Sequence, residues 1–423
     1  MLRKVIHSLS SNAVGQRISG RRLQEEFDVH KLYLLTSYHS AGCDGDAEEI
    51  AHALRMLTFQ DQYRGVQGNL HIQVAHIASQ LHQIWSGEAI DTPSTHNLIK
   101  YSTQQMKLDP LESKEQKISG LAYAAPGSKM FQRQHASGHR PDELPFSHAQ
   151  STSESPLKET SAALHERLGY TLHVAPSKIG TLDSGLGLFV QGHVPLGAVV
   201  SFYPGVIYRP EHYRLMANYP RVDADNPYLL ARFDGAIVDG KPWGKGGNSC
   251  EDRQYPWGSY DPHVCVIKPT YGISAFWERA LCVSQRLGER EGDAAMLRAM
   301  KVDTCMVEVN NPLALGQFAN HPPKGSQPNV VAAAYDVPNI HGAEGEMLRR
   351  CIPNVLCGGD GVTANKTNDH PIEHSFRLPA IVFVASRDIQ DGEEVYLNYR
   401  LSPANRPRWY FPVDVEEDKR RWA

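Results

Sequence analysis

The chain has 423 residues, of which 41% are hydrophobic and 21% charged, with a formal net charge of −4. This length is enough for two domains, since one core serves roughly 100–200 residues. The charge balance has no basic excess, so direct binding to nucleic acid is not predicted. No stretch reaches the roughly 18–20 continuous apolar residues of a membrane span, so no membrane partner is predicted.

The first 24 residues contain several serines and five basic residues, and the first acid is Glu25. Such a composition is typical of a mitochondrial presequence, although an ordinary basic start that leads into a helix has the same residues. The seven cysteines are scattered and odd in number, and no CxxC pair occurs. We therefore expect no disulfide framework and no metal site, but reduced thiols in an intracellular protein of the nucleus or cytoplasm.

Residues 1–126 are predicted to form a helical N-terminal region. Asp46 and Glu49 have the spacing of a capping box, and Ile50 and Leu54 follow on one face. A second helix is indicated by an apolar stripe at helical spacing, made of Val74, Ile77, Ala78, Leu81 and Trp85. We interpret the stripe as core packing, because this is more common than the alternative of a partner-binding groove.

Residues 127–166 are predicted to be a linker, because glycine, proline, serine and histidine replace regular apolar residues there. His135 and His139 are four residues apart in this segment, but no predicted helix would hold them on one face. A metal site is therefore not expected at this pair.

Residues 167–402 are predicted to be mostly β. Short runs rich in Val, Ile, Phe and Tyr alternate with turn residues, as in GLGLFV, AVVSFYPGVIY, YLLARF, AIVDG, NVVAAAYDV and LPAIVFVAS. No regular helices lie between the runs, which favours antiparallel sheets over a doubly wound sheet. Helical insertions are expected at 276–287 and 293–300, where Ala, Leu, Met, Glu and Arg are frequent.

The first cluster with chemical potential is the run 184–190, SGLGLFV. Its two glycines at alternate positions let a backbone approach a ligand closely. A lone GxG usually marks a tight turn. It is no dinucleotide fingerprint here, because neither a third glycine nor a helix follows.

Two further clusters follow it. Asn320 and His321, with Asn329 close behind, supply amide and imidazole groups that can lock a loop, although such a pair also occurs in surface loops. The run 387–399, RDIQDGEEVYLNY, ends in Tyr399. Its phenol is suited to aligning an amine or a sulfonium, whereas a lone tyrosine at a strand end is usually amphipathic packing.

Together and in this order, the three clusters resemble the SET-domain protein-lysine methyltransferases. The resemblance covers about residues 167–402. SGLGLFV together with VPLGAVVSFYPG looks like the family's amino-terminal motif. FANH together with the later PN looks like its Asn-His motif, and RDIQDGEEVYLNY looks like its carboxy-terminal motif. The runs NPLALGQFANH, DVP and GEEVYLNY are most similar to the group called SET domain-containing protein 9.

The resemblance implies a knotted SET-domain β fold preceded by a small α-helical region. It implies S-adenosyl-L-methionine as the cofactor and the ε-amine of a lysine in a protein or peptide as the substrate. Tyr399 would steer the methyl group and the lysine, and Tyr228 matches a lysine-channel tyrosine. The expected cofactor-binding residues are Gly185, Leu186, Gly187, Leu188, Asn320, His321 and Tyr399.

The chain departs from the family pattern at three places. Pro322-Pro323 replaces the common Ser-Cys, and Leu397 stands where many members have the Phe or Tyr that limits methyl number. No zinc-binding cysteines follow Tyr399; the tail 403–423 instead carries an aromatic run at 409–411. We expect this run to pack over the lysine channel, the alternative being a tail that docks on the domain surface.

The proline pair also motivates an alternative function, a catalytically weak or inactive SET-fold protein that binds a partner through its helical region. Two other motifs are interpreted as turns. His370 to His374 matches the zinc-protease pattern HxxEH but sits in an Asn- and Asp-rich segment. The run 244–249, GKGGNS, lacks the spacing of a phosphate loop.

Overall fold

The computed structural model describes residues 20–42, 47–87, 156–180, 184–213, 227–240, 311–338, 343–356, 378–403 and 406–422. Several expectations fall outside these ranges: the basic start, Asp46, the pair at 135 and 139, the helices at 276–287 and 293–300, and the motifs at 244–249 and 370–374. Within the described ranges, no helix is long and apolar enough to cross a bilayer. The same ranges contain no group of three His, Cys, Asp or Glu side chains placed to hold a metal ion.

The helices of the N-terminal half are α2 (Gly20–Ser40), α3 (Ala47–Met56) and α4 (Phe59–Ser86). Thr58 caps α4 by accepting a hydrogen bond from the backbone N–H of Asp61, and Gly87 ends the helix in the left-handed conformation at φ 69°. These two signals set the 28-residue length of α4.

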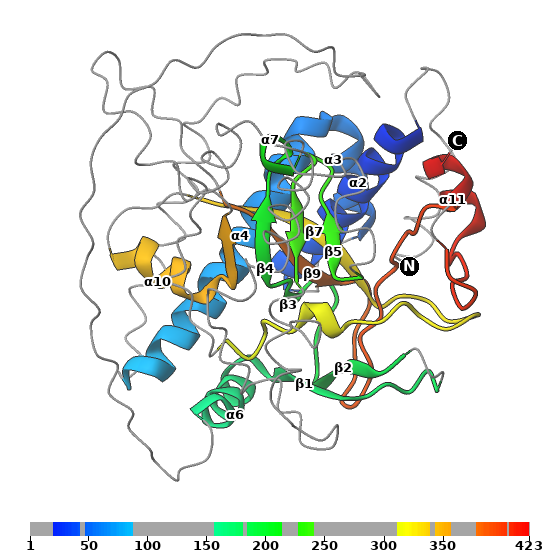
Figure 1. Cartoon of the computed structure of the whole chain (residues 1–423). Helices are drawn as coiled ribbons and strands as arrows, with labels where there is room; N and C mark the ends of the chain where they lie inside the picture. The colour runs from blue at the N-terminus through cyan, green and yellow to red at the C-terminus, as the bar shows by residue number, and fades with distance from the viewer. Residues whose placement is uncertain are drawn as a thin grey trace, which may run out of the picture.

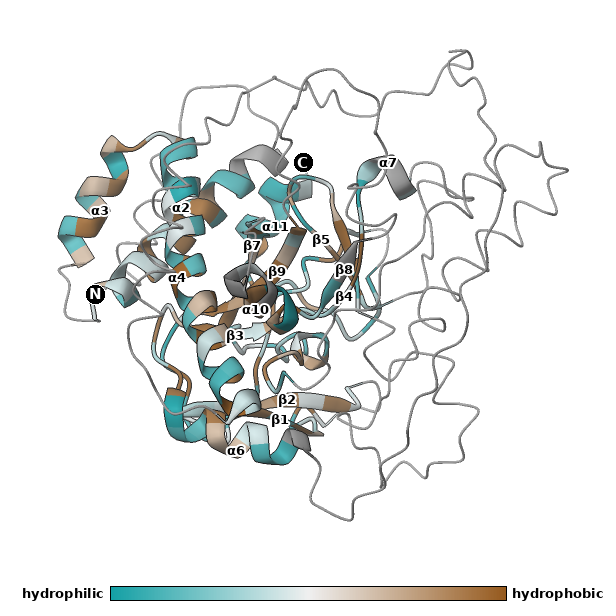
Figure 2. Ribbon diagram, turned by 90° about the vertical axis from the view of Figure 1, so that its left-hand side faces the viewer, coloured by the Kyte–Doolittle hydropathy of each residue, from teal (hydrophilic) through white to brown (hydrophobic). Residues whose placement is uncertain are grey.

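The predicted apolar stripe lies on the inner face of α4. Val74, Ile77, Ala78 and Leu81 are buried there, and Trp85 packs against the same core. In Figure 2, hydrophilic and hydrophobic residues are interspersed along α2 and α4, as in helices with one polar and one apolar face. The interpretation of this stripe as core packing is confirmed.

In the part of the chain that the structure describes, nine strands form three small sheets, and their pairing is antiparallel except for one parallel pair, β4 with β8. The first sheet is the hairpin β1 (Tyr170–Pro176) and β2 (Leu186–Gly192). The second has the order β3 (Val199–Phe202), β9 (Leu378–Ala385), β7 (Val330–Val337). The third has the order β5 (Leu229–Ala231), β6 (Ile237–Asp239), β4 (Gly205–Tyr208), β8 (Asn354–Leu356).

The runs predicted as strands are therefore strands. Their β-branched and aromatic residues fill a shared core, and β9 is buried along its whole length. The remaining elements are short: α7 (Pro210–Tyr213), the 3-10 turn η4 (Gly316–Phe318), α10 (Ala343–Cys351) and α11 (Val415–Trp422). Cys351 is buried, and its sulfur lies 3.7 Å from the carbonyl oxygen of Ala78, in keeping with a thiol that packs as a small side chain.

The helices and the sheets share one hydrophobic core, in which Leu70 and Leu81 of the N-terminal helices lie with Val200 and Phe383 of the strands. Figure 1 shows α2 and α4 running beside the strands rather than apart from them. The two longest elements are these helices, and they lie in the region predicted to be helical, so the described residues combine N-terminal helices with mainly antiparallel sheets. This combination is consistent with the expected fold.

The predicted linker needs a correction at its end. Residues 156–168 form a helix, α6 (Pro156–Leu168), instead of an irregular segment. The hydroxyls of Ser161 and Thr171 are 2.9 Å apart, the side chain of Leu164 is fully buried, and Arg167 donates to Gln83 of α4. Ala, Leu, Glu, Lys and Arg dominate this segment and favour a helix on their own, and packing against β1 and α4 stabilises it further.

A buried arginine ties two of the sheets together. The Arg232 guanidinium, only 1% exposed, donates to the carbonyl oxygens of Tyr335 (3.1 Å) and Ala380 (2.6 Å) and pairs with Asp234 and Asp336. The first two partners belong to β7 and β9, whereas Arg232 follows β5 directly. This side chain therefore fixes the third sheet on the second.

Candidate functional site

The three sequence clusters meet along residues 393–397. On one side, Val395 N donates to Leu188 O of β2 (2.7 Å), and Val190 N donates to Glu393 O (3.0 Å). On the other side, Leu397 N donates to Asn320 O (2.8 Å). The segment thus lies between β2 and the strand-like residues around Asn320.

The side chain of Asn329 completes the same junction. Its Nδ2 donates to Glu394 O (2.8 Å), and its Oδ1 accepts from Tyr396 N (2.7 Å). Asn329 is fully buried, so these bonds satisfy an amide that water does not reach. The second Asn of the Asn-His cluster therefore has a structural role, which is to align the final segment.

Asn320 connects this segment to the glycine loop. Its Nδ2 donates to Leu186 O (3.0 Å), to Glu394 Oε1 (3.1 Å) and, at 3.4 Å, to Ser184 O. The side-chain amide therefore joins residues from all three clusters. The sequence indicated a locking role for the Asn-His pair but not these partners.

Glu394 is a buried carboxylate that the sequence analysis did not single out. Besides Asn320, it accepts hydrogen bonds from Ser177 Oγ (2.7 Å), Lys178 N (2.8 Å) and Tyr396 OH (3.0 Å). Several donors offset the cost of burying a charge. Strand-like alternation after Gly392 would have placed Glu394 inward and its neighbour Glu393 outward, and this was the available signal.

The two glycines of the first cluster serve different needs. Gly185 has φ 52°, and no atom lies within 4 Å of the place where a Cβ would be. At Gly187 a Cβ would lie 2.3 Å from Glu394 Oε1. Gly185 is thus required for its backbone conformation and leaves open space beside it, whereas Gly187 is required for the close approach of the carboxylate.

The backbone of the glycine loop is partly occupied by internal hydrogen bonds. The carbonyl oxygens of Ser184 and Leu186 accept from Asn320, and that of Leu188 accepts from Val395. The side chain of Leu188 lies in the core. A ligand beside this loop would therefore be held by groups other than these three carbonyls.

His321 joins Tyr399 to the C-terminal tail. Its Nδ1 accepts from Tyr399 N (3.3 Å), and its Nε2 lies 2.8 Å from Phe411 O. A neutral ring with its proton on Nε2 satisfies both contacts. Burial lowers the pKa of His321, which favours this neutral form.

Tyr203, Tyr228 and Tyr399 form a cluster, in which Tyr399 lies beside His321. Tyr399 OH donates to Ala319 O (3.0 Å), and Tyr203 OH donates to Tyr228 O (2.7 Å). Burial raises the pKa of Tyr399 well above its usual value, and so does the nearby Tyr228 hydroxyl. Burial likewise raises the pKa of Tyr203, with a contribution from Tyr399. All three phenols therefore stay protonated near neutral pH.

Tyr203 is a second residue of the site, after Glu394, that the sequence analysis missed. It follows β3 and precedes the Pro204-Gly205 turn, at the edge of a sheet. An aromatic residue just before a Pro-Gly turn was the only local signal. Neutral hydroxyl and carbonyl oxygens gathered in an apolar setting can surround a small cationic or amine group without adding charge to it.

The aromatic tail contacts two of the predicted site residues. The ring of Tyr410 stacks on that of His321 at 4.4 Å, and the ring of Trp409 meets that of Tyr399 edge-on at 6.4 Å. Phe411 faces the ammonium of Lys324 at 5.1 Å. The tail thus lies against His321 and Tyr399, while 38% of Trp409 and 43% of Phe411 remain exposed.

The unusual proline pair is accommodated by a tight turn. Ser326 N donates to Pro323 O (2.9 Å), and Gly325 has φ 86°, as a type II turn requires at its third position. Asn320 and His321 make their contacts directly before this turn. The replacement therefore leaves the Asn-His pair joined to β2 and to Tyr399.

Comparison with known proteins gives two matches. The chain is 29% identical over 241 residues to SET domain-containing protein 9 of Pongo abelii, and 28% identical over 241 residues to the protein of the same name from Homo sapiens. The aligned residues are 56% of this chain in both cases, and 66% and 60% of the two relatives, which is less than two thirds of either. No family model matches the chain. The two matches support a SET-domain family relationship for this protein.

Proposed function

We propose that this protein is an S-adenosylmethionine-dependent methyltransferase that modifies the ε-amine of a lysine in a protein substrate. The family relationship supports methyl transfer in general. The observation that carries the proposal is the joining of Asn320, His321 and Tyr399 in one hydrogen-bonded cluster beside the glycine loop. The domain is proposed to span residues 167–402, with the helices before it and the tail after it packed on its core.

The knotted connection of the family is part of the proposal. Residues 393–397 bond to β2 on one side and to Asn320 and Asn329 on the other. A segment held on both sides in this way is what a threaded chain requires. The same contacts explain how residues more than 200 positions apart come to share a site.

The residues present fit S-adenosylmethionine. Gly185 leaves open space at the loop, and Ala319 O and the phenol of Tyr399 supply oxygens in the tyrosine cluster. We propose that Gly185 to Leu188, with the backbone of Asn320 and His321, hold the cofactor. When bound, the cofactor supplies a methyl group on a positive sulfonium.

The chain's own residues would act mainly by alignment. Protonated Tyr399, held by Ala319 O, cannot serve as a base but can orient an incoming amine. Tyr203 and Tyr228 would wall the channel and exclude water, which lowers the pKa of a lysine amine and exposes its lone pair. Alignment of this kind contributes roughly 7–11 kcal/mol when reacting atoms are held near contact. Weak C–H···O contacts from the surrounding oxygens add about 0.5–1 kcal/mol each.

Radiolabelled methyl transfer by the full chain to a library of lysine peptides tests the proposal. Tyr399→Phe should lower transfer at least tenfold, because the hydroxyl that orients the amine is lost. Tyr33→Phe is the matched control, since Tyr33 lies on α2 and takes no part in the site. Equal transfer by wild type and Tyr399→Phe would remove Tyr399 from the mechanism.

A second candidate is a SET-fold protein with little or no turnover that binds a partner through its helices. The exposed apolar corner between α3 and α4, where Met56 is 78% and Phe59 37% exposed, favours it, as does the Pro322-Pro323 turn. Calorimetry with S-adenosylmethionine separates the two. Binding in the micromolar range supports the methyltransferase, and no binding up to millimolar cofactor supports the binding protein.

A further inference from the structure

Arg400, the residue directly after Tyr399, has an unusual backbone conformation. With φ 51°, it is the only non-glycine residue at positive φ within the described ranges. A residue with a Cβ seldom adopts this conformation, because the Cβ crowds the following carbonyl oxygen. Asn398 Oδ1 accepts from Arg400 N (3.2 Å), so the turn itself is fixed locally. The Arg400 side chain is therefore not needed to fix the turn.

The guanidinium of Arg400 connects this turn to two distant helices. Nη1 and Nη2 both donate to the carboxylate of Asp28 on α2, Nη2 at 2.7 Å. Nε lies 2.6 Å from Glu417 Oε1 on α11, in a close ion pair rather than an aligned hydrogen bond. A planar fork that engages two carboxylates in this way fixes both position and direction, which a lysine cannot do.

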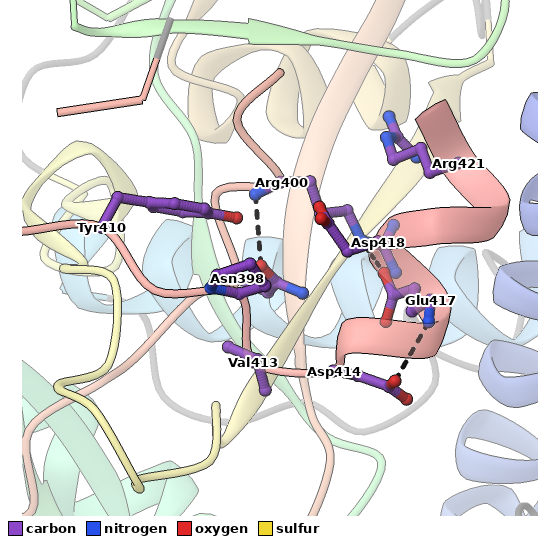
Figure 3. Close-up of a pocket in the computed structure, with 9 residues that line it drawn as sticks. Asn398, Arg400, Tyr410, Val413, Asp414, Glu417, Asp418 and Arg421 are labelled. Atoms are coloured by element: carbon purple, nitrogen blue, oxygen red, sulfur yellow. Dashed lines mark hydrogen bonds and ion pairs between the residues drawn. The ribbon is translucent and has the colours of Figure 1, made fainter. Parts of the chain in front are cut away.

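Other charged groups surround this junction. Figure 3 shows the side chains of a small pocket between the 398–400 turn and α11. Its lining includes the acids Asp414, Glu417 and Asp418 and the bases Arg400 and Arg421. Lys31 of α2 also faces Asp28, Glu417 and Arg400, and burial lowers its pKa. The carboxylates of Asp28 and Glu417 thus face both cations, and Arg400 is the one whose backbone continues into Tyr399.

The tail links the same junction to the site. Tyr410 OH accepts from Leu401 N (3.3 Å), and Arg406 donates to Leu401 O (3.0 Å) and pairs with Asp418. Tyr410 in turn stacks on His321, which accepts from Tyr399 N. The turn, the tail and the imidazole therefore form a closed ring of contacts around the backbone of Tyr399.

We propose that Arg400 is a positioning residue, which holds the phenol of Tyr399 in place by anchoring its turn to Asp28 and Glu417. This inference deepens the proposed methyl transfer and rests on it for its functional consequence. It predicts that the N-terminal helix α2 and the C-terminal helix α11 both influence Tyr399, although neither contributes a side chain to the tyrosine cluster.

Arg400→Gly is the sharpest test, because glycine accepts the positive φ, so the side chain and its guanidinium are removed without added backbone strain. Asp28→Asn weakens the same anchor from the other side, in case the first variant does not fold. Arg408→Ala is the control, an exposed arginine in the same tail. The probe is fluorine NMR of the full chain labelled with 3-fluorotyrosine, with the Tyr399 resonance identified by its absence in Tyr399→Phe.

We expect Arg400→Gly and Asp28→Asn to shift or broaden the Tyr399 resonance, and Arg408→Ala to leave it unchanged. Single-turnover methyl transfer should fall at least tenfold in the first two, with the dissociation constant for S-adenosylmethionine within twofold of wild type. An unchanged Tyr399 resonance in both anchor variants overturns the inference, even if their melting temperatures fall. If wild type transfers no methyl group, the proposed function fails, but the resonances still decide whether Arg400 positions Tyr399.

Discussion

Asn320 and Glu394 stand 74 residues apart in the chain and share a hydrogen bond of 3.1 Å. Around this bond lie the glycine loop, the Asn-His pair and the segment that ends in Tyr399. The carboxylate accepts from four groups, and no water is needed to satisfy it. The pair is therefore the point at which the three sequence clusters become one site.

Glu394→Gln should destabilise the fold by about 1–3 kcal/mol, the typical cost of a buried polar group left without a partner. The amide NH₂ that replaces one oxygen cannot accept from the donors that face it. Urea denaturation measures the change. Glu393→Gln is the matched control, because the Glu393 side chain is one-third exposed and pairs with Arg387 at the surface. This substitution should lower the free energy of unfolding by less than about 1 kcal/mol. Equal losses would show that Glu394 has no special place in the junction.

Gly187→Ala should be more harmful than Gly185→Ala. The added Cβ at Gly187 meets the Glu394 carboxylate at 2.3 Å, and overpacking of this kind costs roughly 1–3 kcal/mol. At Gly185 there is open space, so only the positive φ opposes the change, at about 1–2 kcal/mol. Urea denaturation of the two variants measures which loses more stability. The reverse order would contradict the assigned role of the carboxylate.

Because of His71, we expect the free energy of unfolding to fall in acid. Burial lowers its pKa to about 4, and its Nδ1 lies 2.7 Å from Tyr335 OH. Between about pH 6.5 and 4 the unfolded chain binds a proton that the folded chain does not, so stability falls as the pH falls through this window. The part due to His71 is roughly 3 kcal/mol. His71→Asn should flatten the pH dependence of urea denaturation, whereas His52→Asn, at an exposed position, should leave it as steep as in wild type.

Arg232→Met should destabilise the fold by about 3–5 kcal/mol, because Asp336 would stay partly buried without its partner. Arg64→Met is the control, since Arg64 pairs with Asp61 at the surface of α4 and such pairs contribute at most about 1 kcal/mol. Thermal unfolding of the two variants measures the difference. A comparable loss in both would mean that Arg232 does not hold the sheets together.

Truncation after Leu401 should lower thermal stability, cofactor affinity and methyl transfer together. It removes Tyr410 from the face of His321 and Trp409 from the edge of Tyr399, and it admits water to both rings. Trp422→Ala is the control, because it alters the tail at an exposed position away from these contacts. If truncation changed none of the three quantities, the tail would only dock on the surface.

Local patterns in the sequence were sufficient for many of the elements. The runs that became β3, β7 and β9 are rich in β-branched and aromatic residues, and the stripe of α4 repeats at helical spacing, so neighbouring residues alone carry the signal. The end of the linker was mistaken, because the Gly-, Pro- and Ser-rich character of the preceding segment was extended to residues 156–166, where Ala, Leu, Glu and Arg favour a helix.

The sequence by itself determined which short segments make up the candidate site, since the glycine loop, Asn320-His321 and Tyr399 are recognisable from residue types and order. Only the tertiary structure decided which side chains join them. Glu394, Tyr203 and Arg400 acquire their roles from partners far away in the chain, and Coulomb forces and hydrogen bonds depend on distance in space. No spacing along the sequence encodes those distances, because the fold alone brings the partners together.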